Sequence, residues 1–176
     1  MSSQPAAPTS FVQTLRVTIT ALVAAPVLIG VVLAFAGGSD TESDNWLTAS
    51  PDPIFAGILL VAGVALFALI PAMGYKAQPL APGTDADVAR KQAQGRFQTG
   101  TFLRFAMAEA PVLIGIALAF VDSSYLLYLI GAVIGLTLMY LHVVPTRRVV
   151  ERSAEVLEAH GVDSGLHQEF GYGDRL

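Results

Sequence analysis

Four long apolar segments alternate with shorter polar ones along the chain. The apolar segments run over residues 15–36, 53–74, 101–121 and 124–144. Each has roughly the 20 residues that a helix needs to cross about 30 Å of hydrocarbon. Backbone polar groups in lipid are satisfied only in helices or closed barrels, and these segments lack the alternation of barrel strands. The pattern therefore predicts an all-α fold, a four-helix transmembrane bundle that forms a single membrane domain.

The polar segments predict shorter elements outside the membrane. A Thr-Asp-Ala-Asp run at 84–87 resembles a capping box that opens a polar helix through Gln94, and this helix can continue into the third apolar segment. Thr146 can cap a further cytoplasmic helix over 145–161. Residues 162–176 are expected to form a disordered tail.

The composition fits a lipid environment. Hydrophobic residues make up 53% and charged residues 14% of the 176 residues, and the mean hydropathy is +0.59. A typical soluble domain is about a quarter charged. These values exclude a disordered chain, a nucleic-acid binder and a small secreted domain held by disulfides. The chain has no cysteine, so thiol catalysis and thiolate metal sites are excluded as well.

The charges give the bundle an orientation. All ten basic residues lie near the starts of the first and third apolar segments, between the second and third, or after the fourth. Because basic segments stay inside, we expect a multi-pass protein of the inner (plasma) membrane with both termini cytoplasmic. The segment between the first two apolar segments has no lysine or arginine and carries Asp40, Glu42, Asp44 and Asp52.

The first apolar segment has a second interpretation. Arg16, the apolar run and Ala34-Phe35-Ala36 fit a signal peptide with an A-x-A cleavage site. However, the run is longer than a usual signal-peptide core, and its residues recur in the third segment, where cleavage cannot occur. A retained membrane helix is therefore favoured.

The chain contains an internal repeat. Residues 25–35 read APVLIGVVLAF and residues 110–120 read APVLIGIALAF, with nine of eleven positions identical at an offset of 85. The second apolar segment of each half matches more weakly, since Gly57 with Pro71 and Gly131 with Pro145 show the same spacing. The repeat predicts two related helical hairpins around a pseudo-two-fold axis along the membrane normal.

Small residues recur every four positions on the repeated helices and on the last one. In lipid, such positions let helix backbones approach closely. Two interpretations stay open, a contact between copies in a homo-oligomer and packing inside the bundle. The residues are Pro26, Gly30 and Ala34, their counterparts Pro111, Gly115 and Ala119, and the pair Gly131 and Gly135.

Glu109 is the one acidic residue deep within an apolar segment. About eight helical residues separate it from the start of its segment, which places it roughly 12 Å inside the bilayer. A charge there is costly, so the carboxyl group is expected to be protonated, paired or in a wet cavity. Thr20, Thr137 and Tyr140 lie at similar depth and are candidate partners. The four form a candidate proton- or ion-binding site, unless Glu109 is a neutral acid that joins helices through hydrogen bonds.

Other polar residues carry weaker predictions. Arg104 is expected to extend to the cytoplasmic interface, and His142 to lie at that interface. No nucleophile elbow, phosphate-binding loop, dinucleotide fingerprint or zinc-protease motif occurs, so an enzyme is disfavoured. No metal and no cofactor is expected, because the tail residues fit no strong metal-ligand spacing. Those residues are His160, Asp163, His167 and Glu169.

Residues 99–120 (TGTFLRFAMAEAPVLIGIALAF), with Pro145-Thr146-Arg147, resemble a group of small bacterial four-helix integral membrane proteins. These share an R-x-x-x-A-x-E-x-P-like helix and a last helix that ends in P-T-R, and the resemblance implies no activity. The chain is also faintly similar to the proteolipid c subunits of rotary ATPases, which use one buried carboxylate per pair of hairpins. It departs from them because Glu109 lies on the first helix of its hairpin rather than the second.

These features favour a non-enzymatic inner-membrane protein that acts as an oligomeric or accessory subunit of a membrane complex. Its expected partners are the lipid bilayer and either further copies of the chain or other membrane subunits, and no nucleic acid is expected. The alternative is a small proton- or cation-coupled transporter in which Glu109 titrates.

Overall fold

The computed structural model describes residues 10–36 and 46–173. Four helices in these ranges are long and apolar enough to cross a membrane, which confirms the all-α fold and the four candidate spans. The helices are α1 (Phe11–Ala36), α2 (Pro53–Met73), α3 (Ala86–Asp122), α4 (Tyr125–His142), α5 (Arg147–Leu157) and α6 (Leu166–Glu169). The acidic residues Asp40, Glu42 and Asp44 of the predicted outer segment lie outside the described residues.

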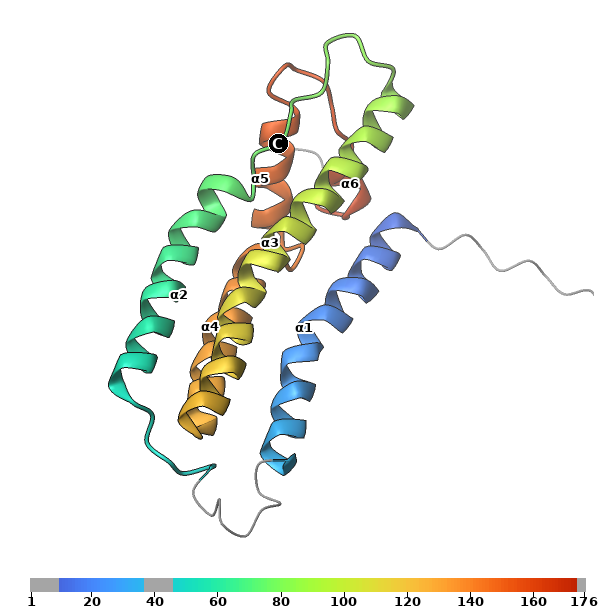
Figure 1. The fold of residues 1–176 in the computed structure, drawn as a ribbon. Helices are drawn as coiled ribbons and strands as arrows, with labels where there is room; N and C mark the ends of the chain where they lie inside the picture. The colour runs from blue at the N-terminus through green and yellow to red at the C-terminus, as the bar shows by residue number, and fades with distance from the viewer. Residues whose placement is uncertain (1–9, 37–45, 174–176) are drawn as a thin grey trace, which may run out of the picture.

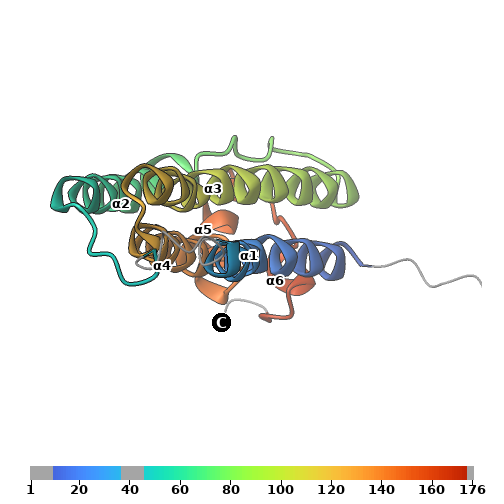
Figure 2. The same ribbon diagram turned by 60° about the horizontal axis from the view of Figure 1, so that its bottom comes forward.

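The helices α3 and α4 form the centre of the bundle, with α1 and α2 on opposite sides of them (Figure 1). With the bottom of the bundle turned forward, α2 lies beside α3, and α1 lies beside α4 (Figure 2), while α2 also contacts α4. The two outer helices therefore attach to the α3–α4 pair rather than to each other.

The longest helix joins the polar and apolar parts of the fold. The side chain of Asp85, rather than that of Thr84, caps α3 by accepting a hydrogen bond from the backbone N–H of Asp87 at 3.0 Å. From there α3 runs for 37 residues, so the predicted polar helix and the third apolar segment are one continuous element. It ends where Ser123 adopts a left-handed conformation (φ 51°) and turns the chain into α4.

Three glycines bring the backbones of α3 and α4 into contact. A Cβ on Gly131 would collide with the carbonyl oxygen of Pro111, and one on Gly115 would lie close to the backbone of α4. Gly135 leaves room for the side chain of Val112 in the same way. Helices in lipid associate by such close packing, because the lipid chains remove the hydrophobic drive between them.

The predicted small-residue positions pack within the bundle. Of these residues, all but Ala34 are buried among the helices of a single chain. The structure therefore places them inside the bundle, so these positions are not free for a contact between copies.

The two halves of the repeat are packed differently. Gly30 of α1 and Gly115 of α3 both face Tyr128 of α4. Gly131 of α4 lies against the backbone of α3, whereas its counterpart Gly57 on α2 has no neighbour within 4 Å for a Cβ. The repeat is thus clear in the sequence, but its two copies flank α4 instead of forming two equivalent hairpins.

A small cap of α5 and α6 covers the first half of α3 (Figure 1). The backbone N–H of Leu80 donates to the carbonyl oxygen of Leu157 at 2.8 Å, which ties the α2–α3 connection to α5. The helix predicted over 145–161 is present as the shorter α5, and its apolar side packs against protein.

Residues 162–173 are folded, in contrast to the disordered tail predicted over 162–176, of which residues 174–176 lie outside the described residues. Leu166 and Phe170 are buried, and the Phe170 ring lies 5.2 Å from that of Phe97 on α3. Glu169 accepts a hydrogen bond from Gln94 at 2.5 Å. The tail folds because its few apolar residues have a surface on α3 and α5 to cover.

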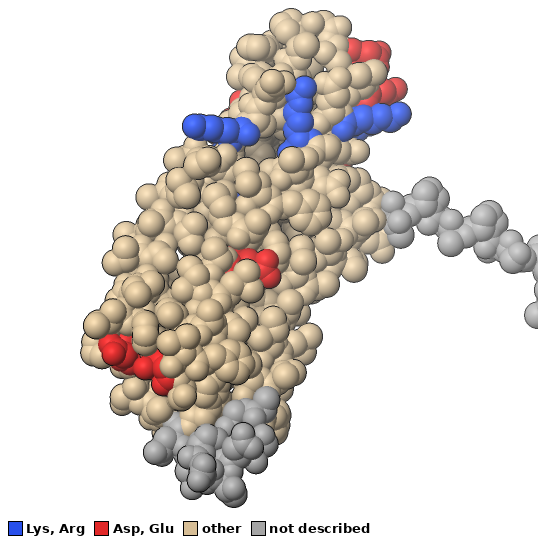
Figure 3. All heavy atoms as spheres, in the orientation of Figure 1, with Lys and Arg blue, Asp and Glu red and all other residues tan. Residues whose placement is uncertain are grey.

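The charges separate along the bundle. On the face shown in Figure 3, lysine and arginine side chains lie only near the end that carries α5 and α6, which we call the basic end. At the opposite end Asp122 accepts a hydrogen bond from the backbone N–H of Asp52 at 2.8 Å. Between the two ends this face is uncharged except for one acidic patch near its middle, as expected for a belt in contact with lipid.

The glycine contact predicts that Gly131→Ala destabilises the bundle. The new methyl group would push α3 and α4 apart, at a cost of about 1–3 kcal/mol typical of overpacking. Gly57→Ala is the matched control, since its methyl group meets open space. Thermal unfolding in detergent, followed by circular dichroism, checks both variants. Equal unfolding temperatures for the two would show that the contact does not hold the helices.

Candidate functional site

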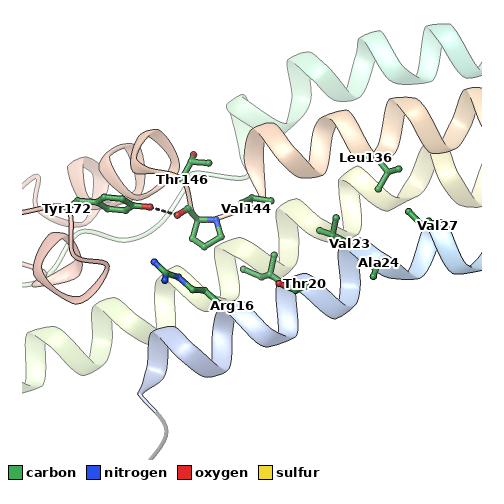
Figure 4. Close-up of a pocket in the computed structure, with 11 residues that line it drawn as sticks. Arg16, Thr20, Val23, Ala24, Val27, Leu136, Val144, Thr146 and Tyr172 are labelled. Carbon is green, nitrogen blue, oxygen red and sulfur yellow. Dashed lines mark hydrogen bonds between the residues drawn. The ribbon is translucent and has the colours of Figure 1, made fainter.

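A groove with a volume of about 670 Å³ lies between α1 and α4, toward the basic end (Figure 4). The segment that links α4 to α5 and the C-terminal segment close this end of it. We call it the α1–α4 groove. Its lining residues are Arg16, Ile19, Thr20, Val23, Ala24, Val27, Leu136, Val144, Pro145, Thr146 and Tyr172.

The way α1 is attached explains why the groove exists. The hydroxyl group of Tyr128 donates to the carbonyl oxygen of Pro26, and that of Tyr125 donates to the carbonyl oxygen of Gly30 at 2.9 Å. Within the described chain, no hydrogen bond joins the earlier turns of α1 to α4. The two helices are therefore fastened over the later turns of α1, and the groove opens over the turns nearer the basic end.

The groove is apolar along its length and polar at one end. Ile19, Val23 and Leu136 belong to its walls, while Arg16 and Tyr172 lie near the basic end (Figure 4). The hydroxyl group of Tyr172 donates to the carbonyl oxygen of Pro145 at 2.7 Å, which holds the C-terminal segment over this end. Arg16 is exposed and has no ion-pair partner among the described residues.

This chemistry suits an amphiphilic ligand. Pockets for small molecules commonly have volumes of about 300–1,000 Å³, and this groove lies within that range. Its walls would hold a hydrocarbon chain, and the guanidinium group of Arg16 would attract a polar or anionic head group. Among the described lining residues there is no carboxylate and no histidine to act as an acid–base pair.

Arg104 forms a second polar centre, which the sequence did not predict. The Arg104 side chain was expected to extend to the cytoplasmic interface, but it is only 2% exposed. Its guanidinium group donates to the carbonyl oxygen of Gly74 at 3.2 Å and to the hydroxyl group of Thr101 at 3.0 Å. It also lies 4.4 Å from the centre of the Tyr75 ring, a cation–π contact. The reason for the difference is that the α2–α3 connection and α5 cover this turn of α3, so the side chain cannot reach water.

Tyr75 joins Arg104 to the end of α4. Its hydroxyl group lies 3.3 Å from Nδ1 of His142, which is buried rather than exposed at the interface. Burial raises the pKa of Tyr75, although Arg104 and Arg152 act against this by favouring the phenolate. Tyr75 is therefore neutral at physiological pH and can share its proton with His142.

The four predicted ion-site residues differ in their surroundings. Glu109 is half-buried and has no hydrogen bond or ion pair with the described residues. Tyr140 is 66% exposed, and Thr137 donates to the carbonyl oxygen of Val133 on its own helix. Thr20 lines the α1–α4 groove. Among the described residues no hydrogen bond joins any two of these four, so their shared role as an ion site stays a prediction.

Among the described residues no cluster of three or more histidine, aspartate or glutamate side chains could hold a metal ion. Comparisons with protein-family models, curated proteins and solved structures gave no match. The function of the chain is therefore inferred from the chemistry of the groove and of the Arg104 centre.

The attachment of α1 predicts that Tyr128→Phe loosens it. Hydroxyl hydrogen bonds between membrane helices contribute about 0.5–2 kcal/mol, and the variant loses this without changing the volume of the ring. Tyr140→Phe, an exposed position on the same helix, is the control. Thermal unfolding in detergent should show a lower midpoint for Tyr128→Phe alone. A midpoint equal to that of Tyr140→Phe would mean that the hydroxyl group does not fasten α1.

Proposed function

We propose that this protein is a non-enzymatic multi-pass membrane protein that binds a lipid in the α1–α4 groove and acts as an accessory subunit of a membrane assembly. The observation that carries the proposal is the groove itself, an apolar channel with Arg16 near its basic end. A second helix, which is about 10–12 Å in diameter with its side chains, needs more space than this groove offers. A single hydrocarbon chain with a head group is the ligand that matches both parts.

The distribution of charge supports a place in the inner leaflet. Described lysines and arginines lie toward the same end of the bundle as the polar end of the groove. By the positive-inside rule this end faces the cytoplasm, where anionic lipids give the surface a negative potential. Arg16 would then meet the phosphate group of a lipid whose chain lies along α1.

The accessory role is supported by the groups that the groove lacks. Its described lining residues include hydroxyl groups but no carboxylate or histidine to activate them, so a bound lipid would be held rather than converted. A membrane protein that binds a lipid without catalysing a reaction acts through its contacts with neighbouring proteins. We therefore expect it to assemble with further copies of itself or with other membrane subunits.

The proposal predicts that Ala24→Trp empties the groove of lipid. Ala24 lines the groove, so an indole there would occupy the space of the chain. Ala21→Trp is the control, because Ala21 is exposed on the same helix outside the groove lining. Native mass spectrometry of protein titrated with phosphatidylglycerol should show several-fold fewer bound lipids for Ala24→Trp than for the control.

Two outcomes would contradict this function. Equal numbers of bound lipids for Ala24→Trp and Ala21→Trp would exclude the groove as the binding site. A wild-type spectrum that shows only lipid-free monomer would exclude both the lipid and the assembly. Circular dichroism on each variant confirms that the helices are intact before binding is compared.

A further inference from the structure

The charge of Arg104 is not compensated within the described chain. Its side chain is 2% exposed, and its hydrogen-bond acceptors, Gly74, Thr101 and Ser153, are all neutral oxygens. Its Nε atom is buried without a hydrogen-bond partner. A buried charge without a counter-charge is costly, so it calls for an anion from outside the described residues.

The groups around Arg104 add to the positive charge. Arg152 lies 4.6 Å from the centre of the Tyr75 ring, the same ring that Arg104 contacts. Ion pairs in the described ranges join Arg90 to Glu169 and Arg147 to Glu151, so neither involves Arg104 or Arg152. The region therefore carries several cations close together.

Two adjoining cavities lead from Arg104 to the surface between α3 and the α2–α3 connection. The inner cavity, with a volume of about 20 Å³, is lined by Arg104 and is large enough for one water molecule. The outer one, which we call the Lys76 hollow, has a volume of about 280 Å³. Lys76, Arg96 and Gly100 line both, and the described lining residues of neither include a carboxylate.

Local structure keeps this entrance open. A Cβ on Gly100 would lie 3.7 Å from Nη1 of Arg104, so the glycine leaves that side of the guanidinium group uncovered. Arg96 is fixed in place, because its guanidinium group donates to the carbonyl oxygen of Gln78 at 2.6 Å. Lys76 is exposed, and its ammonium group has no partner among the described residues.

We propose that the Lys76 hollow binds a phosphate group, with Lys76 and Arg96 at its surface and Arg104 behind it. The contact with Arg104 passes through a water molecule in the inner cavity, since that cavity is too small for the anion itself. The phosphate group belongs either to a lipid head group or to a soluble phosphate. The site lies on the α2–α3 side of the bundle, so it is independent of the α1–α4 groove.

The chain supplies a matched pair of variants. Lys76 and Lys91 are its two lysines, both are exposed, and only Lys76 lines the hollow. Lys76→Gln removes one charge at the site, and Lys91→Gln removes the same charge farther along the basic end. Loss of an exposed charge contact corresponds to about fivefold weaker binding.

The experiment uses full-length protein in nanodiscs, with thermal stabilisation as the measure of binding. One arm adds inorganic phosphate to phosphatidylcholine discs, with chloride at equal ionic strength as the reference. The other arm replaces part of the phosphatidylcholine by phosphatidylglycerol without added phosphate. Stabilisation in the first arm identifies a soluble anion, and stabilisation in the second alone identifies a lipid head group. Stabilisation in either arm supports the proposed site if Lys76→Gln reduces this stabilisation and Lys91→Gln does not.

A second pair of variants tests the geometry without changing any charge. Gly100→Ala places a methyl group beside Arg104 and should weaken binding, whereas Gly57→Ala meets open space outside the hollow and should not. The proposal is overturned if neither arm stabilises the wild type, or if Lys76→Gln and Lys91→Gln behave alike. Binding that is unchanged in Gly100→Ala would exclude Arg104 from the site. The Ala24→Trp variant should retain phosphate binding, which separates this site from the groove.

Discussion

The close approach of α3 and α4 is the contact on which the rest of the bundle depends. Lipid gives helices no hydrophobic reason to associate, so backbone contact at Gly115 and Gly131 supplies most of what holds the centre together. The outer helices then attach through buried apolar side chains, among them Leu15 and Ile19 of α1 and Ile70 of α2, and through polar contacts. Tyr128 donates a hydrogen bond to a backbone carbonyl group of α1, and Arg104 donates one to the backbone carbonyl group of Gly74 at the end of α2.

This manner of attachment leaves space on both sides of the centre. Since α1 is fastened over its later turns, a groove remains over its earlier ones. Since the end of α2 is fastened by a buried cation, positive charge collects where α2 turns into the connection to α3. The two proposed binding sites thus lie on different sides of the tightly packed α3–α4 pair.

The sequence predicted the elements better than the sites. Length and hydropathy were sufficient for the four spans, and the spacing of Gly131 and Gly135 indicated a close helix contact. Pairing was harder, because the repeat suggested two equal hairpins, whereas both copies face α4, Gly30 against the side chain of Tyr128 and Gly115 against the backbone. Arg104 was misplaced although it lies seven residues before Pro111, on the same packed face of α3. That helical spacing was the signal that its side chain points inward, whereas its charge alone suggested exposure.

The unbroken course of α3 has a mechanical consequence. Its 37 residues correspond to a rod of about 55 Å, longer than the hydrocarbon layer is thick. One end lies under α6, and the other meets the tip of α4. A force applied to the cap would therefore tilt the rod as a lever and shift the packing at the far leaflet. The cap at one end of the bundle and the turn into α4 at the other are therefore joined by a single continuous helix.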